Sequence, residues 1–122
     1  LLENSEKAYV ISSGSGMGKV ALSGRSPYCA SKFALRGLML SLAKEYKKTN
    51  IHFVHLTLGS VLTAFGPLSL EKKKEKQEKG KRYLDPKWLA HYIVTKLENE
   101  TLEPETPIYP RHYFEESRKG KT

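Results

Sequence analysis

Tyr28 and Lys32 are the residues whose types and spacing most directly indicate chemistry in this sequence. They lie four positions apart at the start of a segment with helical periodicity, so both side chains project from one face, about one turn apart. An ammonium beside a phenol favours the phenolate and lowers the pKa of the phenol from its usual value of about 10. A tyrosine in that setting can act as a general acid or a general base near neutral pH.

A long helix is needed to hold this pair, and the sequence predicts one from Pro27 to about Tyr46. Additional apolar residues at positions 35, 39 and 40 widen its apolar surface, which predicts packing against a sheet and against a second subunit. Asn50 is predicted to end this helix. The residues that define the helix recur at spacings of three and four: Ala30, Phe33, Ala34, Leu38, Leu42 and Tyr46.

Two buried strands are predicted, one on each side of this helix in the sequence. Residues 9–11 form a short apolar run that stops at Ser12, where a glycine-rich loop through Gly18 begins. Residues 51–58 form a longer apolar and β-branched run before Gly59. Strand, helix and strand in this order predict two parallel strands joined by a crossover helix.

The remainder of the chain combines a basic segment, a helix and a proline-rich end. Residues 70–82 carry six lysines and one arginine against three glutamates, which predicts a solvated helix or a mobile loop. Asp85 as a cap, followed by proline in the first turn, predicts a helix over about 86–99. Residues 103–110 permit a short edge strand, and the charged tail beyond Arg111 is predicted to fray.

Composition limits the class of protein. The 122 residues, 39% of them hydrophobic, suffice for one modest core. No apolar stretch approaches the roughly 18 residues that cross a bilayer, and no secretory signal is recognised. Because the chain starts at Leu1 rather than at methionine, its natural start is expected to be missing. The single cysteine, Cys29, cannot form an internal disulfide, which favours a reducing intracellular compartment.

Charge and histidine content bear on the alternatives. The formal net charge of +8 could attract nucleic acid, anionic lipid or a phosphorylated cofactor. The lysine-rich stretch has no interleaved aromatic residue before Tyr83, so a solvated surface is favoured over nucleic-acid binding. Trp88 and Tyr92 are predicted to lie in the core or at the rim of a substrate cleft. No zinc site is expected, because the histidines lie on opposite strand faces or are isolated: His52, His55, His91 and His112.

Three segments, taken in order, resemble landmarks of the short-chain dehydrogenase/reductase family. The middle one is the most specific, because it matches the family's Tyr-x-Ala-Ser-Lys. The resemblance runs from about residue 7 to residue 108. It implies an α/β fold, a Rossmann-like parallel sheet with flanking helices, present as a partial domain. Residues 1–122 would form the carboxy-terminal part of a single Rossmann-like oxidoreductase domain. The segments are Ser12-Ser13, Tyr28-Cys29-Ala30-Ser31-Lys32 and Leu58-Gly59-Ser60-Val61-Leu62-Thr63.

The resemblance also implies an activity, namely hydride transfer between NAD or NADP and a carbonyl or alcohol substrate. Tyr28 would donate or accept the proton. Lys32 would hold the nicotinamide ribose hydroxyls and lower the pKa of the tyrosine. A serine would bind the substrate oxygen: Ser13 is preferred for its register with the family's Ile-Ser-Ser, although Ser15 has the usual distance to the tyrosine.

The cofactor residues match the family only in part. Gly59, Val61 and Thr63 would meet the nicotinamide carboxamide and phosphate region, but Leu58 stands where the family has proline. The family's phosphate loop, Thr-Gly-x-x-x-Gly-x-Gly, and the asparagine of its catalytic set are absent from this sequence. The glycines at 14, 16 and 18 do not have the loop's spacing. The isolated chain is therefore expected to lack useful cofactor affinity unless another chain supplies the missing strands.

We predict from these observations a cytoplasmic, NAD(P)-dependent oxidoreductase of the short-chain type. It would act on a small carbonyl or alcohol substrate, contain no metal, and form a homo-oligomer through the 27–46 helix, with neither a nucleic-acid nor a membrane partner. The alternatives are a truncated, non-catalytic interaction module and a basic nucleic-acid-binding domain. The sequence specifies neither the substrate nor the direction of the reaction.

Overall fold

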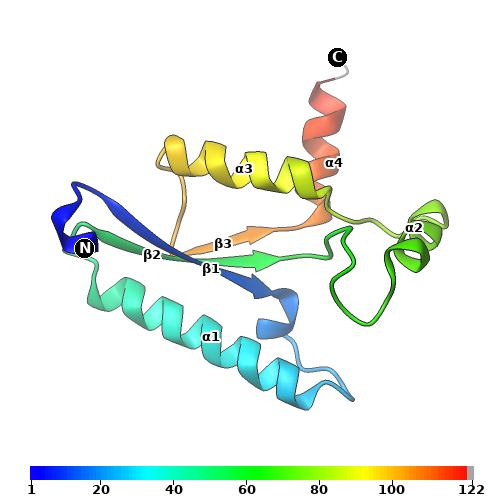
Figure 1. Cartoon of the computed structure of the whole chain (residues 1–122), viewed down its shortest axis with the longest axis horizontal. Helices are drawn as coiled ribbons and strands as arrows, with labels where there is room; N and C mark the ends of the chain where they lie inside the picture. The colour runs from blue at the N-terminus through cyan, green and yellow to red at the C-terminus, as the bar shows by residue number, and fades with distance from the viewer. Residues whose placement is uncertain (121–122) are drawn as a thin grey trace. The chain divides into compact units, whose positions relative to one another are not determined.

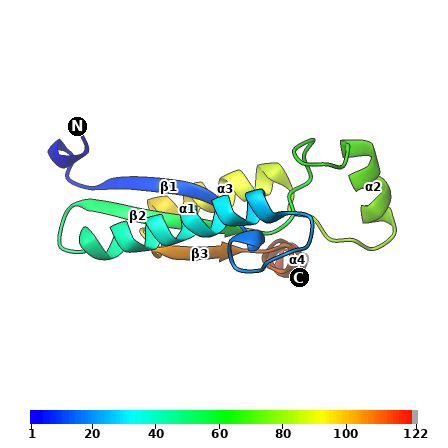
Figure 2. The same ribbon diagram turned by 90° about the horizontal axis from the view of Figure 1, so that it is seen from below.

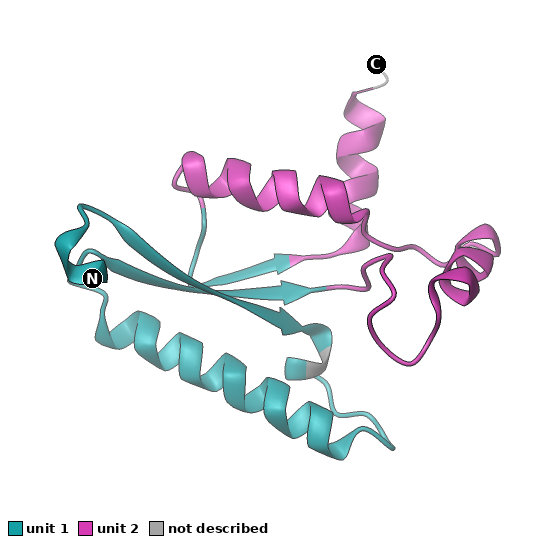
Figure 3. Cartoon of the chain, viewed as in Figure 1, with its two compact units in different colours: residues 1–58, 102–107 teal, residues 59–101, 108–122 magenta. Residues whose placement is uncertain are grey.

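A computed structural model describes residues 1–120, apart from the side chain of Met17. The chain forms two compact units (Figure 3). Unit 1 comprises residues 1–58 and 102–107, and unit 2 comprises residues 59–101 and 108–122.

A parallel sheet forms the centre of unit 1. Strand β1 covers Ala8–Ser15 and pairs in parallel with β2, Ile51–Leu58, from Ala8 opposite Ile51 to Ser15 opposite Leu58. The short strand β3, Glu105–Ile108, completes the order β1-β2-β3. The second strand and the parallel pairing are confirmed. The predicted end of the first strand at Ser12 is wrong, because β-pairing continues through the serines and Gly14.

Helix α1, Ser26–Glu45, connects β1 to β2 and runs along one face of these strands (Figures 1 and 2). Its predicted extent is confirmed within a residue at each end, with proline in its first turn. The prediction that Asn50 ends the helix is wrong. Asn50 lies beyond it, directly before β2, and its side-chain amide donates to the backbone oxygens of Leu2, Glu3 and Ser5.

The core of unit 1 is built by α1 and by both faces of the sheet. Ile51 and Val54 are both buried, although by alternation their side chains point to opposite faces of β2, as expected for a parallel sheet. By contrast, Phe33 and Leu38 on α1 are exposed, at 44% and 57%. The buried apolar residues of this unit are Ala8, Cys29, Met39, Ile51, Val54 and Leu56.

Unit 2 is mainly helical. The basic segment forms α2, Leu70–Glu78, and Asp85 caps α3, Pro86–Glu98, by accepting a 2.8 Å hydrogen bond from the Trp88 amide. The predicted α3 and its cap are therefore confirmed. The prediction of a frayed tail is wrong, because residues 110–119 form a further helix, α4, Pro110–Lys119.

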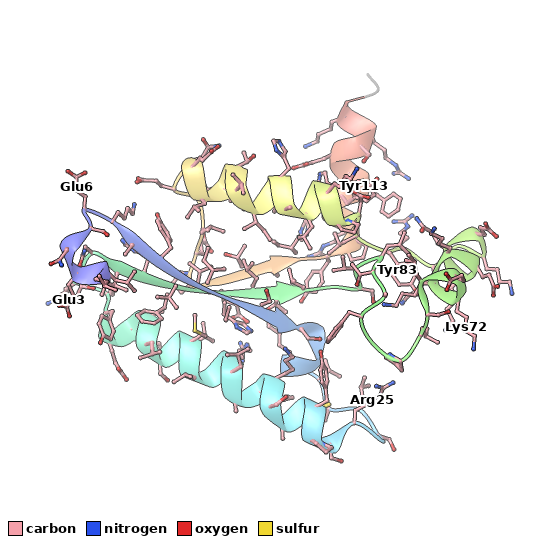
Figure 4. The ribbon with its side chains drawn as sticks, viewed as in Figure 1. Glu3, Glu6, Arg25, Lys72, Tyr83 and Tyr113 are labelled. Carbon is pink, nitrogen blue, oxygen red and sulfur yellow. The ribbon has the colours of Figure 1, made fainter. Side chains whose placement is uncertain are left out.

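The additional helix α4 is stabilised by contacts with α3. The Trp88 indole donates a 2.9 Å hydrogen bond to Glu116, and its ring lies 5.2 Å from that of Tyr113, which Figure 4 labels on α4. Tyr92 stacks on the same indole at 4.7 Å. Trp88 and Tyr92 thus take part in helix packing. Among residues 1–120, no helix combines the length and the apolar character that a membrane span requires.

These elements make the chain an α/β protein with a three-stranded parallel sheet, a partial Rossmann-like domain. In such folds the loops at the carboxyl ends of the parallel strands carry the functional residues. The predicted site residues lie in or directly after those ends, or on the helix that follows.

Candidate functional site

Tyr28 and Lys32 lie together on the first turns of α1. The Nζ atom of Lys32 is 5.6 Å from the centre of the Tyr28 ring, so the two side chains share a face, as their spacing predicts. Figure 4 labels Arg25 on the loop directly before the helix. Both side chains are half-buried and keep access to solvent. The geometry provides a phenol with an ammonium alongside.

Lys32 also reaches strand β1. Its ammonium donates one long hydrogen bond, 3.5 Å, to the backbone oxygen of Ser13. Ser13, the third predicted catalytic residue, therefore contacts Lys32 through its main-chain oxygen, while its side chain is exposed. Ser15 points to the same side of the strand by alternation. This geometry leaves the choice between the two serines open.

Ser12 has a different role, because it contacts a buried histidine. Its hydroxyl lies 2.8 Å from Nδ1 of His55, its partner across the β1-β2 pairing. His55 is fully buried, and its Nε2 has no hydrogen-bond partner among the described residues. Burial lowers the pKa of His55, the nearby cations add to this effect, and the charge of Glu105 opposes it. A neutral imidazole therefore occupies this part of the core.

Two of the three glycines in the 14–18 run, Gly14 and Gly18, have packing roles that the sequence does not reveal. A Cβ on Gly14 would lie 2.3 Å from His55 ring atoms and 2.8 Å from the Leu56 oxygen. One on Gly18 would lie 3.1 Å from the carbonyl oxygen of Lys32, so this glycine lets the chain approach the turn that carries the ammonium. At Gly16 the space is open.

A salt-bridge network that the sequence did not predict lies beside the pair. Glu105 in β3 accepts hydrogen bonds of 2.7 and 3.1 Å from Arg36 of α1 and forms a 2.9 Å ion pair with Lys19. The hydrogen bond from Arg36 is the main reason that the pKa of Glu105 falls to about 2, and Lys19 contributes further. The network joins the segment after β1 to the helix and the sheet. No local signal predicts it, since Arg36 and Glu105 are 69 residues apart.

The predicted cofactor loop after β2 belongs to unit 2. The Gly59 amide donates to Ile108 at 2.8 Å, and a Cβ on Gly59 would lie 2.7 Å from Pro110, so this glycine permits close packing. Val61 pairs with Leu84 in an isolated parallel bridge. Thr63 is half-buried, and its hydroxyl accepts a 3.4 Å hydrogen bond from the amide of Phe65, which leaves the hydroxyl proton free to be donated.

A second lysine, also missed by sequence reasoning, contacts this loop. Lys73 of α2 is 8% exposed, and its ammonium donates to the backbone oxygens of Thr63 at 2.8 Å and Phe65 at 2.5 Å. The sequence did not distinguish Lys73 from the six other cations of residues 70–82, which are exposed. Within residues 1–120, no group of three or more histidine, cysteine or acidic side chains could hold a metal ion.

Comparison with protein families matches residues 1–74 to short chain dehydrogenase. These residues include β1, α1, β2 and the loop that carries Thr63. No curated protein sequence matches the chain significantly.

Two solved structures share the fold. A short chain dehydrogenase from Salmonella enterica serovar Typhi str. CT18 superposes with a TM-score of 0.67 at 19% identity, over 90% of this chain and 44% of the other. A short-chain dehydrogenase from Streptomyces avermitilis gives 0.63 at 18% identity, over 92% and 48% respectively. This chain therefore spans about half the length of each.

Proposed function

The chain belongs to the short chain dehydrogenase family, and on this premise we propose that it is the carboxy-terminal part of an NAD(P)-dependent oxidoreductase in which Tyr28 transfers the proton. The observation that carries the proposal is that the Nζ atom of Lys32 lies 5.6 Å from the centre of the Tyr28 ring, on the same helix face. The family match supplies the reaction class, and the side-chain geometry supplies the candidate for proton transfer.

In this proposal the chain's own residues transfer the proton and bind the substrate oxygen. The Tyr28 hydroxyl donates a proton to a carbonyl oxygen in reduction, or accepts one from an alcohol in oxidation. Lys32, whose Nζ atom lies 5.6 Å from the centre of the Tyr28 ring, would hold the nicotinamide ribose hydroxyls. Ser13, or Ser15 in its place, would donate a hydrogen bond to the substrate oxygen. A nicotinamide cofactor, when bound, supplies or accepts the hydride.

Each unit, taken by itself, offers donors of the kind that the nicotinamide end of such a cofactor needs. Among the described residues Lys32 makes one long hydrogen bond, so two of its three N–H groups remain for ribose hydroxyls. The hydroxyl proton of Thr63 can be donated to a carboxamide or a phosphate oxygen. Gly59 and Val61 would contribute main-chain atoms, although the Gly59 amide already donates to Ile108.

Two of the three glycines in the 14–18 run are packed against the fold. The space beside Gly14 is filled by a histidine ring, and Gly18 packs against the backbone of Lys32. We therefore propose that tight cofactor binding needs residues corresponding to the part of the solved structures that this chain does not span. Calorimetric titration of the 122-residue chain with NADH and with NADPH should give no measurable heat. Micromolar binding would contradict this part of the proposal.

Substitution of the tyrosine is the direct test of the function. Because general acid–base catalysis contributes typically 10²- to 10⁴-fold, Tyr28→Phe should lower kcat for carbonyl reduction by about that factor. The assay follows NADH or NADPH oxidation by the protein at the length its gene encodes, against a panel of simple ketones. Tyr46→Phe, on the exposed carboxyl end of the same helix, is the matched control. Equal rates for wild type and Tyr28→Phe would remove Tyr28 from the mechanism.

The remaining expectations concern partners and compartment. We propose a homo-oligomer that contacts through α1, supported by the exposure of Phe33 and Leu38 on that helix. Sedimentation of wild type and Leu38→Glu tests it, and identical monomeric behaviour would exclude it.

A cytoplasmic location is supported by the one buried, unpaired cysteine, Cys29. An interaction module without catalysis is the second candidate, favoured by the same exposed face of α1.

A further inference from the structure

Lys73 is an unusual inward-facing residue. It is the buried side chain of α2, whose other residues are exposed or, for Leu70, half-buried. Figure 4 labels its neighbour Lys72 on the same helix. An apolar side chain would normally occupy such a position, because removing an ammonium from water is costly unless its protons find partners. The structure therefore has to account for a cation here.

Two backbone oxygens provide these partners. The ammonium donates to Thr63 at 2.8 Å and to Phe65 at 2.5 Å, and within residues 1–120 it forms no salt bridge with a carboxylate. Hydrogen bonds that involve a charged donor are shorter and stronger than neutral ones. The charge of Lys73 thus acts on the shape of the main chain over residues 63–65.

The two halves of this loop are held by different means. Its first half is fixed by main-chain pairing, since Leu62 donates to Leu84 at 3.0 Å and Leu84 donates to Ser60 at 2.8 Å. From Thr63 onward the chain leaves this pairing and reaches Gly66, which has a φ of +101°. The ammonium of Lys73 holds the second half.

The contacts of Lys73 bear on the Thr63 side chain as well as on its carbonyl. The peptide unit is planar, so fixing this oxygen fixes the peptide plane that follows Thr63 and the torsion that leads into it. Phe65, whose amide donates to the Thr63 hydroxyl, is held by the same ammonium. The hydroxyl that would meet the cofactor is thereby oriented from two sides.

We propose that Lys73 is a positioning residue for the cofactor loop: by binding the Thr63 and Phe65 carbonyl oxygens it presets the Thr63 hydroxyl toward the nicotinamide end of the cofactor. This inference rests on the proposed function for the role of Thr63. Lys73 itself touches neither substrate nor reacting atoms. Its effect is on how often the loop has the geometry that binds cofactor.

The first measurement needs no cofactor. Amide hydrogen exchange is compared among wild type, Lys73→Met, Lys73→Arg and Lys74→Met, the last on an exposed position of the same helix. Lys73→Met keeps the aliphatic stem without the ammonium and should raise exchange at residues 63–65 by about tenfold or more, with β2 unchanged. Lys73→Arg should restore part of the protection, and Lys74→Met should match wild type. Unchanged exchange in Lys73→Met would overturn the proposal.

The second measurement uses the protein at the length its gene encodes. The KM for NADH or NADPH should rise about tenfold in Lys73→Met, with kcat within about threefold of wild type, and Lys73→Arg should lie between. A loosened loop with an unchanged cofactor KM, in a protein that Tyr28→Phe inactivates, would overturn the positioning role alone. Equal activity of wild type and Tyr28→Phe would instead overturn the proposed function, and the cofactor role of Lys73 with it.

Discussion

Two lysines in different units each donate to the backbone oxygen of a predicted site residue. They differ in how many hydrogen bonds their ammonium groups donate within the described residues. Lys32 in unit 1 is half-buried and makes one 3.5 Å hydrogen bond to Ser13. Lys73 in unit 2 is 8% exposed and makes two short ones, to Thr63 and Phe65. The first ammonium keeps donors for a ligand, whereas the second is committed to the fold.

Arg36 sharpens this contrast within a single helix. It lies four residues after Lys32 on α1, so the two cations share a face. The guanidinium is occupied by two hydrogen bonds to Glu105, but no carboxylate within the described part of the chain neutralises Lys32. Spare hydrogen-bonding capacity, rather than charge, therefore separates the candidate functional cation from the structural ones.

Replacing Lys32 and Lys73 one at a time tests most directly whether the two lysines have different roles. Lys32→Met should lower turnover by roughly 100-fold, because the phenol loses its neighbouring ammonium. Its free energy of unfolding should change by no more than about 0.5 kcal/mol, as for substitutions away from buried features. Lys73→Met should instead destabilise unit 2 by about 1–3 kcal/mol, since two inward-facing carbonyl groups lose their donor.

Steady-state kinetics and urea unfolding of both variants supply these two readouts. Lys44→Met, exposed on the same helix as Lys32, is the control for a charge change on α1. If Lys32→Met unfolded as readily as Lys73→Met while retaining turnover, both lysines would be structural, and the distinction drawn from their hydrogen bonds would fail.

Gly14, near the end of β1, and Gly16, directly after it, differ in whether the space beside them is filled. At Gly14 the space is filled, so Gly14→Ala should drive its Cβ into the His55 ring and the Leu56 carbonyl and cost about 1–3 kcal/mol or more. Gly16 faces open space at a φ outside the left-handed region, so Gly16→Ala should be neutral or slightly stabilising. Equal thermal midpoints for the two variants would show that His55 does not fill this space.

Local patterns in the sequence were sufficient to predict the elements that depend on them. Strand β2, helix α3 and its Asp85 cap follow from periodicity and from capping residues within a few positions, and all are confirmed. The proximity of Tyr28 and Lys32 has the same origin, because four-residue spacing on a helix fixes it. What these two residues do chemically remains a prediction.

Contacts between distant segments could not be predicted in the same way. Gly14 was considered for a phosphate loop, but its neighbour is His55, which only strand pairing brings beside it. The tail beyond Arg111 was predicted to fray because it is charged, whereas α4 is stabilised by a contact with Trp88, 28 residues away. Lys73 sits in a charged run whose lysines look alike in sequence, and only burial distinguishes it.

The salt-bridge network of Glu105, Arg36 and Lys19 gives the prediction with the smallest expected effect, because its side chains are partly exposed to solvent. The pKa of Glu105 in the folded chain is about 2, below the ordinary 4.5, chiefly because Arg36 hydrogen-bonds the charged form. A depressed pKa contributes stability that is fully present above about pH 4.5 and is lost as the pH falls toward 2. Glu105→Gln should therefore lower the free energy of unfolding at pH 6 by on the order of 1–2 kcal/mol, allowing for solvent screening.

The pH dependence of that difference separates the ion pair from mere packing. As the pH falls from 4.5 toward 2, wild type loses the charge that Glu105→Gln lacks at every pH, so their unfolding free energies should converge. Urea titrations at several pH values measure this, with Glu103→Gln, exposed two residues earlier, as the control. A constant gap across the range would mean that Arg36 and Lys19 contribute by contact rather than by charge, and that occupied cations in unit 1 are not held electrostatically.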